Sequence, residues 1–251
     1  MTVDVRDAIE QITRGMLVEE KQVKFATRVS LTRIAKRVEV AEKHEMRDSF
    51  HEPTDFTLSG TFVRPATASN LSAEVKLKDF ASKSSTPAAK YLEAQIKGGS
   101  RRQKRFERAL ESIGALPPGY RVVPGEGAQL DVHGNMSRGQ IVQILSYFKA
   151  FPEAGYKANM SDKRREALQR GSRTRQGFAY FVGRPGDRLP HGIYQRVQFA
   201  GGTAIRAVMI FVREAVYQKT FDFGYVATST IEQHFAGEFT RALAEARATQ
   251  R

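Results

Sequence analysis

The sequence predicts an α+β protein with a long N-terminal helix and a C-terminal helix packed on a mainly antiparallel sheet, and with a helical or loop insertion. Residues 17–50 contain neither Gly nor Pro, which favours one long helix. Apolar and polar residues alternate without interruption over residues 71–78, which is typical of a strand with one buried face. Predicted strands occur in groups and do not alternate singly with helices, so a parallel doubly wound sheet is disfavoured.

The predicted N-terminal helix carries its main apolar face at a 3.6-residue period, on Leu31, Ile34, Ala35, Val38, Ala41 and Met46. Phe25 and Val29 fall on a different face. This second face predicts either a bend near Ser30 or a helix covered on two sides, by a sheet and by a neighbouring subunit. Pro53 disfavours helix at the residue before it and marks the end of the element.

A hairpin and a connector are expected next. Residues 56–64 and 71–78 are predicted to pair through the turn-prone residues 65–70. Residues 81–100 are rich in Ser, Thr, Ala and Gly and predict a connector, after which Ser100 is a suitable N-cap for a helix over about 101–113.

The second half of the chain returns from helices to strands. Pro and Gly residues predict a loop over 116–127, and the apolar spacing predicts a helix near 138–151. Three strands are expected at 178–182, 193–197 and 204–212, followed by an amphipathic helix carrying Ile231, Phe235, Phe239 and Leu243. The prediction is one α+β domain over residues 1–251, with an inserted basic helical or loop region at about 85–175.

The composition of the chain excludes several kinds of functional site. The chain has no cysteine, which excludes disulfides, thiolate metal sites and a cysteine nucleophile. Neither a signal-peptide core nor a run of about 20 apolar residues is present, so we expect synthesis in the cytoplasm and no membrane contact. The net charge of +13 predicts attraction to a nucleic acid, an anionic membrane or an acidic protein.

One group of residues, two acids and a lysine, has a pattern found in nucleases. Asp55, followed by Glu74 and Lys76 on the same face of a predicted strand, resembles the acid, acid and lysine arrangement of PD-(D/E)xK nucleases. Charged residues on the wet face of a strand are far commoner, so a surface role is the preferred interpretation.

No cofactor or metal is expected. The five histidines, His44, His51, His133, His191 and His234, show no clustering typical of ligands. The chain contains neither a Gly-x-Ser-x-Gly elbow nor a Walker loop.

Two basic segments are candidate contacts with DNA phosphates or with a partner protein, although such runs are as often solvated faces. The candidate residues are Arg101, Arg102, Lys104 and Arg105 in the first segment, and Lys163, Arg164, Arg165, Arg170, Arg173 and Arg175 in the second.

Several short motifs resemble a family of prophage-encoded minor tail or tail-completion proteins. They are Pro53-Thr54-Asp55-Phe56-Thr57, Pro65-Ala66, Lys78-Asp79, Lys90-Tyr91-Leu92, Gly98-Gly99, Lys104-Arg105-Phe106-Glu107 and Gly134-Asn135-Met136-Ser137-Arg138-Gly139-Gln140-Ile141. The resemblance covers most of the chain and is most specific between residues 134 and 146. The last strand and the closing amphipathic helix are also similar in layout to tail-completion proteins of long-tailed phages.

This resemblance implies a structural virion protein of the neck, tail-completion or minor tail position, with no catalytic residues. It implies a ring of identical subunits, neighbouring neck or tail proteins as partners, and a position close to packaged DNA. A basic DNA-binding protein or a PD-(D/E)xK-like nuclease remains the alternative. Loss of binding at high salt would distinguish electrostatic DNA binding from assembly through apolar faces.

Overall fold

The computed structural model describes residues 2–14, 16, 19–80, 86–152, 158–184, 186, 188–199 and 201–248. They form two compact units. The terminal unit combines Met1–Gly98 with Gln218–Arg251, and the inserted unit is Gly99–Tyr217. The insertion therefore begins and ends later than the expected 85–175. The reason is that the three C-terminal strands pair with a strand inside the insertion and not with the first hairpin.

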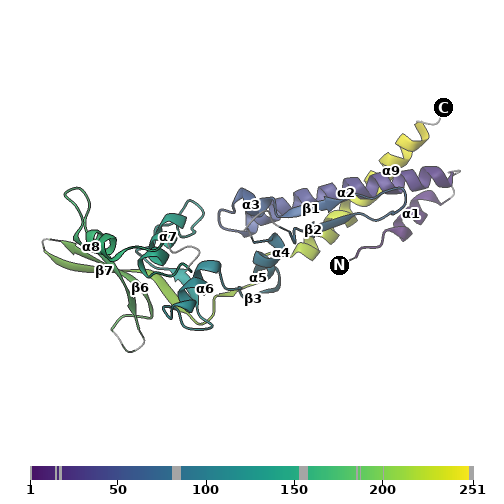
Figure 1. Cartoon of the computed structure of the whole chain (residues 1–251). Helices are drawn as coiled ribbons and strands as arrows, with labels where there is room; N and C mark the ends of the chain where they lie inside the picture. The colour runs from purple at the N-terminus through teal and green to yellow at the C-terminus, as the bar shows by residue number, and fades with distance from the viewer. Residues whose placement is uncertain are drawn as a thin grey trace. The chain divides into compact units, whose positions relative to one another are not determined.

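The terminal unit is organised around two long helices, α2 (Glu20–Ser49) and α9 (Phe223–Ala248). They lie side by side (Figure 1). Arg33 pairs with Glu245 at 2.8 Å and Arg37 pairs with Glu238 at 2.7 Å, so the helices run antiparallel. Their contact buries Ala26, Ile34, Val38, Phe235, Phe239, Ala242 and Leu243, and α1 (Arg6–Thr13) packs on the same cluster.

The long N-terminal helix confirms the sequence prediction with a later start. Gln22 caps it by accepting from the backbone N–H of Glu19, and it continues without interruption through Ser30. The Ser30 hydroxyl is buried and donates to the Thr27 carbonyl, so this polar group has a hydrogen-bond partner inside the helix. Of the second face, Val29 packs against the core and Phe25 stays 40% exposed.

The predicted first hairpin is present but shorter. Strands β1 (Thr61–Arg64) and β2 (Glu74–Leu77) pair antiparallel and lie against α2. The expected start of the first strand is instead a helical turn, α3 (Asp55–Leu58), because the Thr54 side chain accepts from the Thr57 N–H and caps it.

The predicted connector is only partly loop. Two short helices, α4 (Ala88–Tyr91) and α5 (Glu93–Lys97), fall within it, and residues 81–85 lie outside the described residues. A second buried cluster forms here from Met46, Ala88, Leu92 and Phe221.

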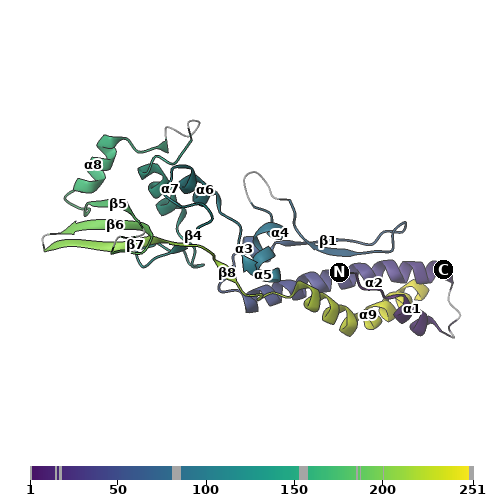
Figure 2. The ribbon, with the colours of Figure 1, turned by 90° about the horizontal axis from the view of Figure 1, so that it is seen from below.

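The inserted unit contains a four-stranded antiparallel sheet in the order β4-β7-β6-β5. Its strands are β4 (Arg121–Pro124), β5 (Phe178–Gly183), β6 (Gly192–Phe199) and β7 (Gly202–Val212). The last three confirm the predicted strands, whereas β4 falls where a loop was expected. Helices α6 (Arg105–Ser112), α7 (Arg138–Tyr147) and α8 (Asp162–Arg170) lie on one side of this sheet (Figure 2).

The ends of the inserted unit meet in a small sheet. Strand β3 (Gly99–Ser100) pairs antiparallel with β8 (Val216–Tyr217). Ser100 is thus in a strand and does not cap a helix. The helix that follows starts four residues later than expected, because the Glu107 carboxylate accepts from the backbone N–H of Lys104 and fixes the first turn there.

Candidate functional site

Positive charge is concentrated in the inserted unit. Residues 99–217 contain 20 Lys and Arg against 9 Asp and Glu, a formal net charge of +11. The remaining residues contain 20 against 18, a net charge of +2. The inserted unit is therefore the part of the chain that attracts polyanions, and its exposed cations are the natural candidates for a site.

One residue of the first predicted basic segment has a structural role. Arg101 turns inward, and its guanidinium donates to both carboxylate oxygens of the fully buried Glu107, at 2.5 and 2.9 Å. The same carboxylate accepts from the Val122 N–H at 2.8 Å, which ties the start of α6 to β4. Arg102, Lys104 and Arg105 are exposed. Of the four candidates, Arg101 is removed from the proposed contact set.

The second predicted segment is displayed on the surface. Helix α8 begins at the Ser161 cap, whose hydroxyl accepts from the Arg164 N–H. Arg165 differs from its neighbours, because it pairs with Asp162 at 2.8 Å and its guanidinium lies 5.7 Å from the centre of the Tyr147 ring. The other five cations are exposed and form no ion pair within the described residues: Lys163, Arg164, Arg170, Arg173 and Arg175. We call these five residues the basic ridge.

A tight turn holds the last two arginines of the ridge. Gly171 has a φ of +74°, which disfavours other residues. A Cβ on Gly177 would lie 2.2 Å from the Gln169 carbonyl oxygen, so only glycine fits there. The Gln176 side chain donates to the Gln198 carbonyl at 2.9 Å and fastens the turn to β6. The turn thus positions the ridge beside the sheet.

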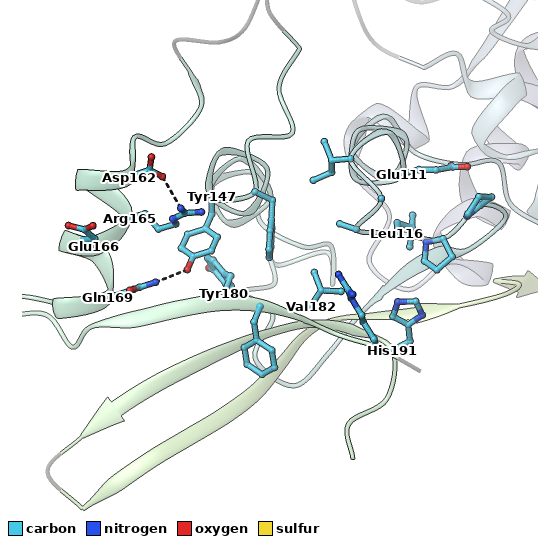
Figure 3. Close-up of a pocket in the computed structure, with 18 residues that line it drawn as sticks. Glu111, Leu116, Tyr147, Asp162, Arg165, Glu166, Gln169, Tyr180, Val182 and His191 are labelled. Atoms are coloured by element: carbon cyan, nitrogen blue, oxygen red, sulfur yellow. Dashed lines mark hydrogen bonds and ion pairs between the residues drawn. The ribbon is translucent and has the colours of Figure 1, made fainter. Parts of the chain in front are cut away.

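A hollow of about 1170 Å³ opens next to the ridge (Figure 3). It is bounded by α8, the end of α7, the loop after α6, β5 and His191. Gln169 donates to the Tyr147 hydroxyl at 3.1 Å, and the Tyr180 hydroxyl donates to Gln143 at 2.9 Å. These bonds fix the aromatic wall of the hollow.

His191 is a titratable side chain of the hollow whose pKa departs from its ordinary value. Burial lowers its pKa, and the nearby Arg184 guanidinium lowers it further. The ring contacts Phe211 edge-on at 5.0 Å between centroids and lies 5.9 Å from Tyr120. It is therefore a neutral, packed side chain at neutral pH.

The nuclease-like residues lie on two elements, with Glu74 and Lys76 on strand β2 and Asp55 on helix α3. Glu74 pairs with Lys76 at 2.6 Å and with Arg64 at 3.4 Å, so its charge is already compensated on the hairpin. Asp55 is exposed in the first turn of α3, outside the hairpin. Across the described part of the chain, no three His, Asp or Glu side chains gather as a metal would require.

Two features escaped sequence reasoning. The Arg101–Glu107 pair is six residues apart across an irregular segment, which no helix or strand period reveals. The hollow collects residues from positions 111 to 191 and has no local sequence signal.

No family model, no curated protein and no solved structure matches the chain. Within the residues that the structure describes, no helix combines the length and the apolar character needed to cross a membrane.

Proposed function

We propose that the chain is a non-catalytic structural protein of a tailed-phage virion, acting at the neck, tail-completion or minor tail position through assembly into a ring. The motifs that resemble the tail-completion family support the assignment to a virion. The observation that carries assembly is a groove on the terminal unit that is lined by the exposed Val40 and contains a buried carboxylate oxygen that accepts no hydrogen bond within the described residues.

Three large apolar side chains of the helix pair are exposed. Phe25 and Val40 fall within about 60° of each other around the axis of α2, about four turns apart. Phe25 is 40% exposed and Val40 is 52% exposed, and Tyr225 on α9 is 71% exposed. Of these three, Val40 is the residue that also lies in a groove, where an exposed apolar side chain is a candidate contact with another protein.

Val40 also lines a groove of about 710 Å³ between α2 and α9, which we call the helix-pair groove. Glu238 lies in it with its carboxylate almost fully buried, paired with Arg37. Its Oε2 atom is buried and accepts no hydrogen bond within the described residues. A buried carboxylate oxygen without a donor costs stability, and a second copy that displaces the covering side chains of the groove would supply a donor.

Contact between this groove and a different surface of the next copy is head-to-tail. Such contacts produce closed rings when the rotation between subunits closes. The groove thus provides the kind of surface that a ring protein requires.

Assembly is tested with the purified chain, by mass photometry and negative-stain microscopy. We expect closed oligomers for the wild type and monomers of unchanged melting temperature for Val40→Asp. Val132→Asp is the matched control, because Val132 is 78% exposed, belongs to the inserted unit and does not line the groove. A wild type that stays monomeric at every concentration, or a Val40→Asp variant that assembles normally, contradicts the proposal.

The virion assignment is tested separately. Particles purified from an induced lysogen that carries the gene should contain the chain at a constant ratio to the major tail proteins by mass spectrometry. Absence of the chain from intact particles contradicts the assignment. Glu74 and Lys76 lie together on the hairpin and Asp55 lies on α3. The nuclease alternative is tested by magnesium-dependent cleavage of DNA.

A further inference from the structure

We propose that the basic ridge binds the sugar-phosphate backbone of double-stranded nucleic acid without reading its sequence. The inference rests on charge and geometry in the inserted unit and holds whether or not the chain forms a ring. It also distinguishes, among the ten candidate cations, the five residues of the ridge from Arg101 and Arg165, which form ion pairs within the chain.

The charges of the ridge have no ionic partner within the described residues. Arg101 forms an ion pair with Glu107. Arg165 forms an ion pair with Asp162 and lies over the Tyr147 ring. The five ridge cations lie within a segment of 13 residues, and none of them forms an ion pair within the described residues. Gathering like charges costs some stability in an isolated protein, and a bound anion would offset that cost.

The side chains of the ridge suit phosphate. Four of the five are arginines, whose planar guanidinium forms two parallel hydrogen bonds with a phosphate group. Three of the residues lie on α8, and two lie on the turn that Gly171 and Gly177 hold in place. Part of the ridge is thus pre-ordered, which reduces the entropy lost on binding.

An acidic protein fits the ridge less well. The centre of a protein interface is normally depleted in charge and enriched in aromatic side chains. The apolar residues of α8 are Ala167 and Leu168, and Leu168 packs into the core of its own unit. No large apolar anchor is left on the helix, which leaves an interaction dominated by charge, as expected for a polyanion with evenly spaced phosphates.

A two-stranded ribbon lies next to the ridge. Phe178 of β5 pairs with Val197, and β6 and β7 continue beyond that point as the pairs Gln198 with Thr203 and Phe199 with Gly202. Gln176 links the turn to this ribbon at Gln198. The major groove of B-DNA admits a two-stranded antiparallel ribbon, so a duplex whose backbone meets the ridge has a groove available for the ribbon.

The test measures binding of the full chain to a fluorescent duplex of arbitrary sequence over a range of salt concentrations. The ridge variant is Arg164→Gln, Arg170→Gln, Arg173→Gln and Arg175→Gln together. The matched control removes four exposed cations of the terminal unit, none of which forms an ion pair within the described residues: Arg14→Gln, Lys21→Gln, Arg47→Gln and Lys90→Gln. Both variants lose four charges and keep helix-compatible side chains.

We expect the wild type to lose affinity steeply with salt. In the ridge variant the slope of log K against log salt should fall by roughly 3 to 4, and the affinity at low salt by about tenfold or more. The control should keep the wild-type slope. Circular dichroism melting should be unchanged in both variants, because the substituted side chains are exposed.

Two results would overturn the inference. One is an equal loss of slope in the ridge variant and in the control, which would mean that net charge alone drives binding. The other is displacement of the duplex by polyglutamate as effective as displacement by unlabelled duplex at the same charge, which would indicate an acidic protein partner. Failure of ring assembly affects neither readout, so the two proposals fail separately.

Discussion

Each unit has a fully buried glutamate on one of its helices, and the two glutamates differ in their hydrogen-bond partners. In the inserted unit Glu107 is fully buried and accepts hydrogen bonds from Arg101 and from the backbone N–H groups of Lys104 and Val122. In the terminal unit Glu42 is also fully buried, but neither carboxylate oxygen accepts a hydrogen bond within the described residues.

The difference decides which form of each acid is stable. Burial raises the pKa of Glu42 to about 9 from an ordinary 4.5, and the nearby Glu45 and Asp222 carboxylates add to the shift. Burial also acts to raise the pKa of Glu107, but the bonds from Arg101, Val122 and Lys104 outweigh it and hold the pKa below its ordinary value. Glu107 is therefore stable as the carboxylate, because Arg101 and two backbone N–H groups reach it, whereas Glu42 is stable as the protonated acid.

The largest expected effect tests whether the units depend on each other. Phe239 is fully buried between α9 and α2, and its ring stacks on Phe235 with 6.0 Å between centroids. Phe239→Ala should lower the free energy of unfolding by about 3–5 kcal/mol through lost burial and a cavity. Hydrogen-exchange mass spectrometry should show faster exchange in residues 1–98 and 218–248 and little change in residues 99–217. Equal acceleration in both units would mean that they unfold together.

Next in size is the buried ion pair of the inserted unit. Glu107→Leu leaves the Arg101 guanidinium buried and without its carboxylate, which typically costs about 3–5 kcal/mol. Exchange should increase in the inserted unit. The double variant with Arg101→Met should recover much of the loss, because no uncompensated charge remains. A single variant as stable as the wild type would show that the pair contributes little.

Glu42 predicts a pH dependence of the opposite sign to that of Glu107. Between pH 4.5 and 9 the folded chain holds the Glu42 proton and the unfolded chain does not, so stability falls as pH rises, by about 1.4 kcal/mol per pH unit. Glu107 contributes stability above its ordinary pKa of 4.5, and that contribution is lost as the pH falls through its lowered folded value.

Glu42→Gln isolates this dependence, because glutamine has nearly the shape of the protonated acid and does not ionise. The variant should be more stable than the wild type at pH 7, by up to about 3 kcal/mol, and the two should converge near pH 5. Urea unfolding at several pH values measures both. A wild type whose stability rises steadily between pH 6 and 9 would contradict the protonated assignment.

The smallest effect concerns the hairpin of the terminal unit. Replacing Glu74 and Lys76 together with alanine should change stability by about 0.5 kcal/mol or less, because the two side chains pair with each other near the surface. Oligomer formation should be unchanged. Magnesium-dependent DNA cleavage by the wild type that disappears in the double variant would instead support the nuclease alternative.

Local patterns predicted most of the elements. Absence of Gly and Pro predicted α2, and the four-residue spacing of Phe235, Phe239 and Leu243 predicted the buried face of α9. The alternation in residues 178–212 predicted three strands. Strand β4 was missed, because four residues between Pro- and Gly-rich turns carry too little periodicity.

The sequence by itself determined the α+β class, the long helices, the three C-terminal strands and the excess of positive charge, since each follows from local spacing or from composition. Tertiary structure alone decided which strands share a sheet, and hence where the insertion ends. It also decided which cations are available. Arg101 and Arg165 look like their neighbours in the sequence, but a buried carboxylate and an aromatic ring brought close by folding engage them, whereas the ridge has no such neighbours among the described residues.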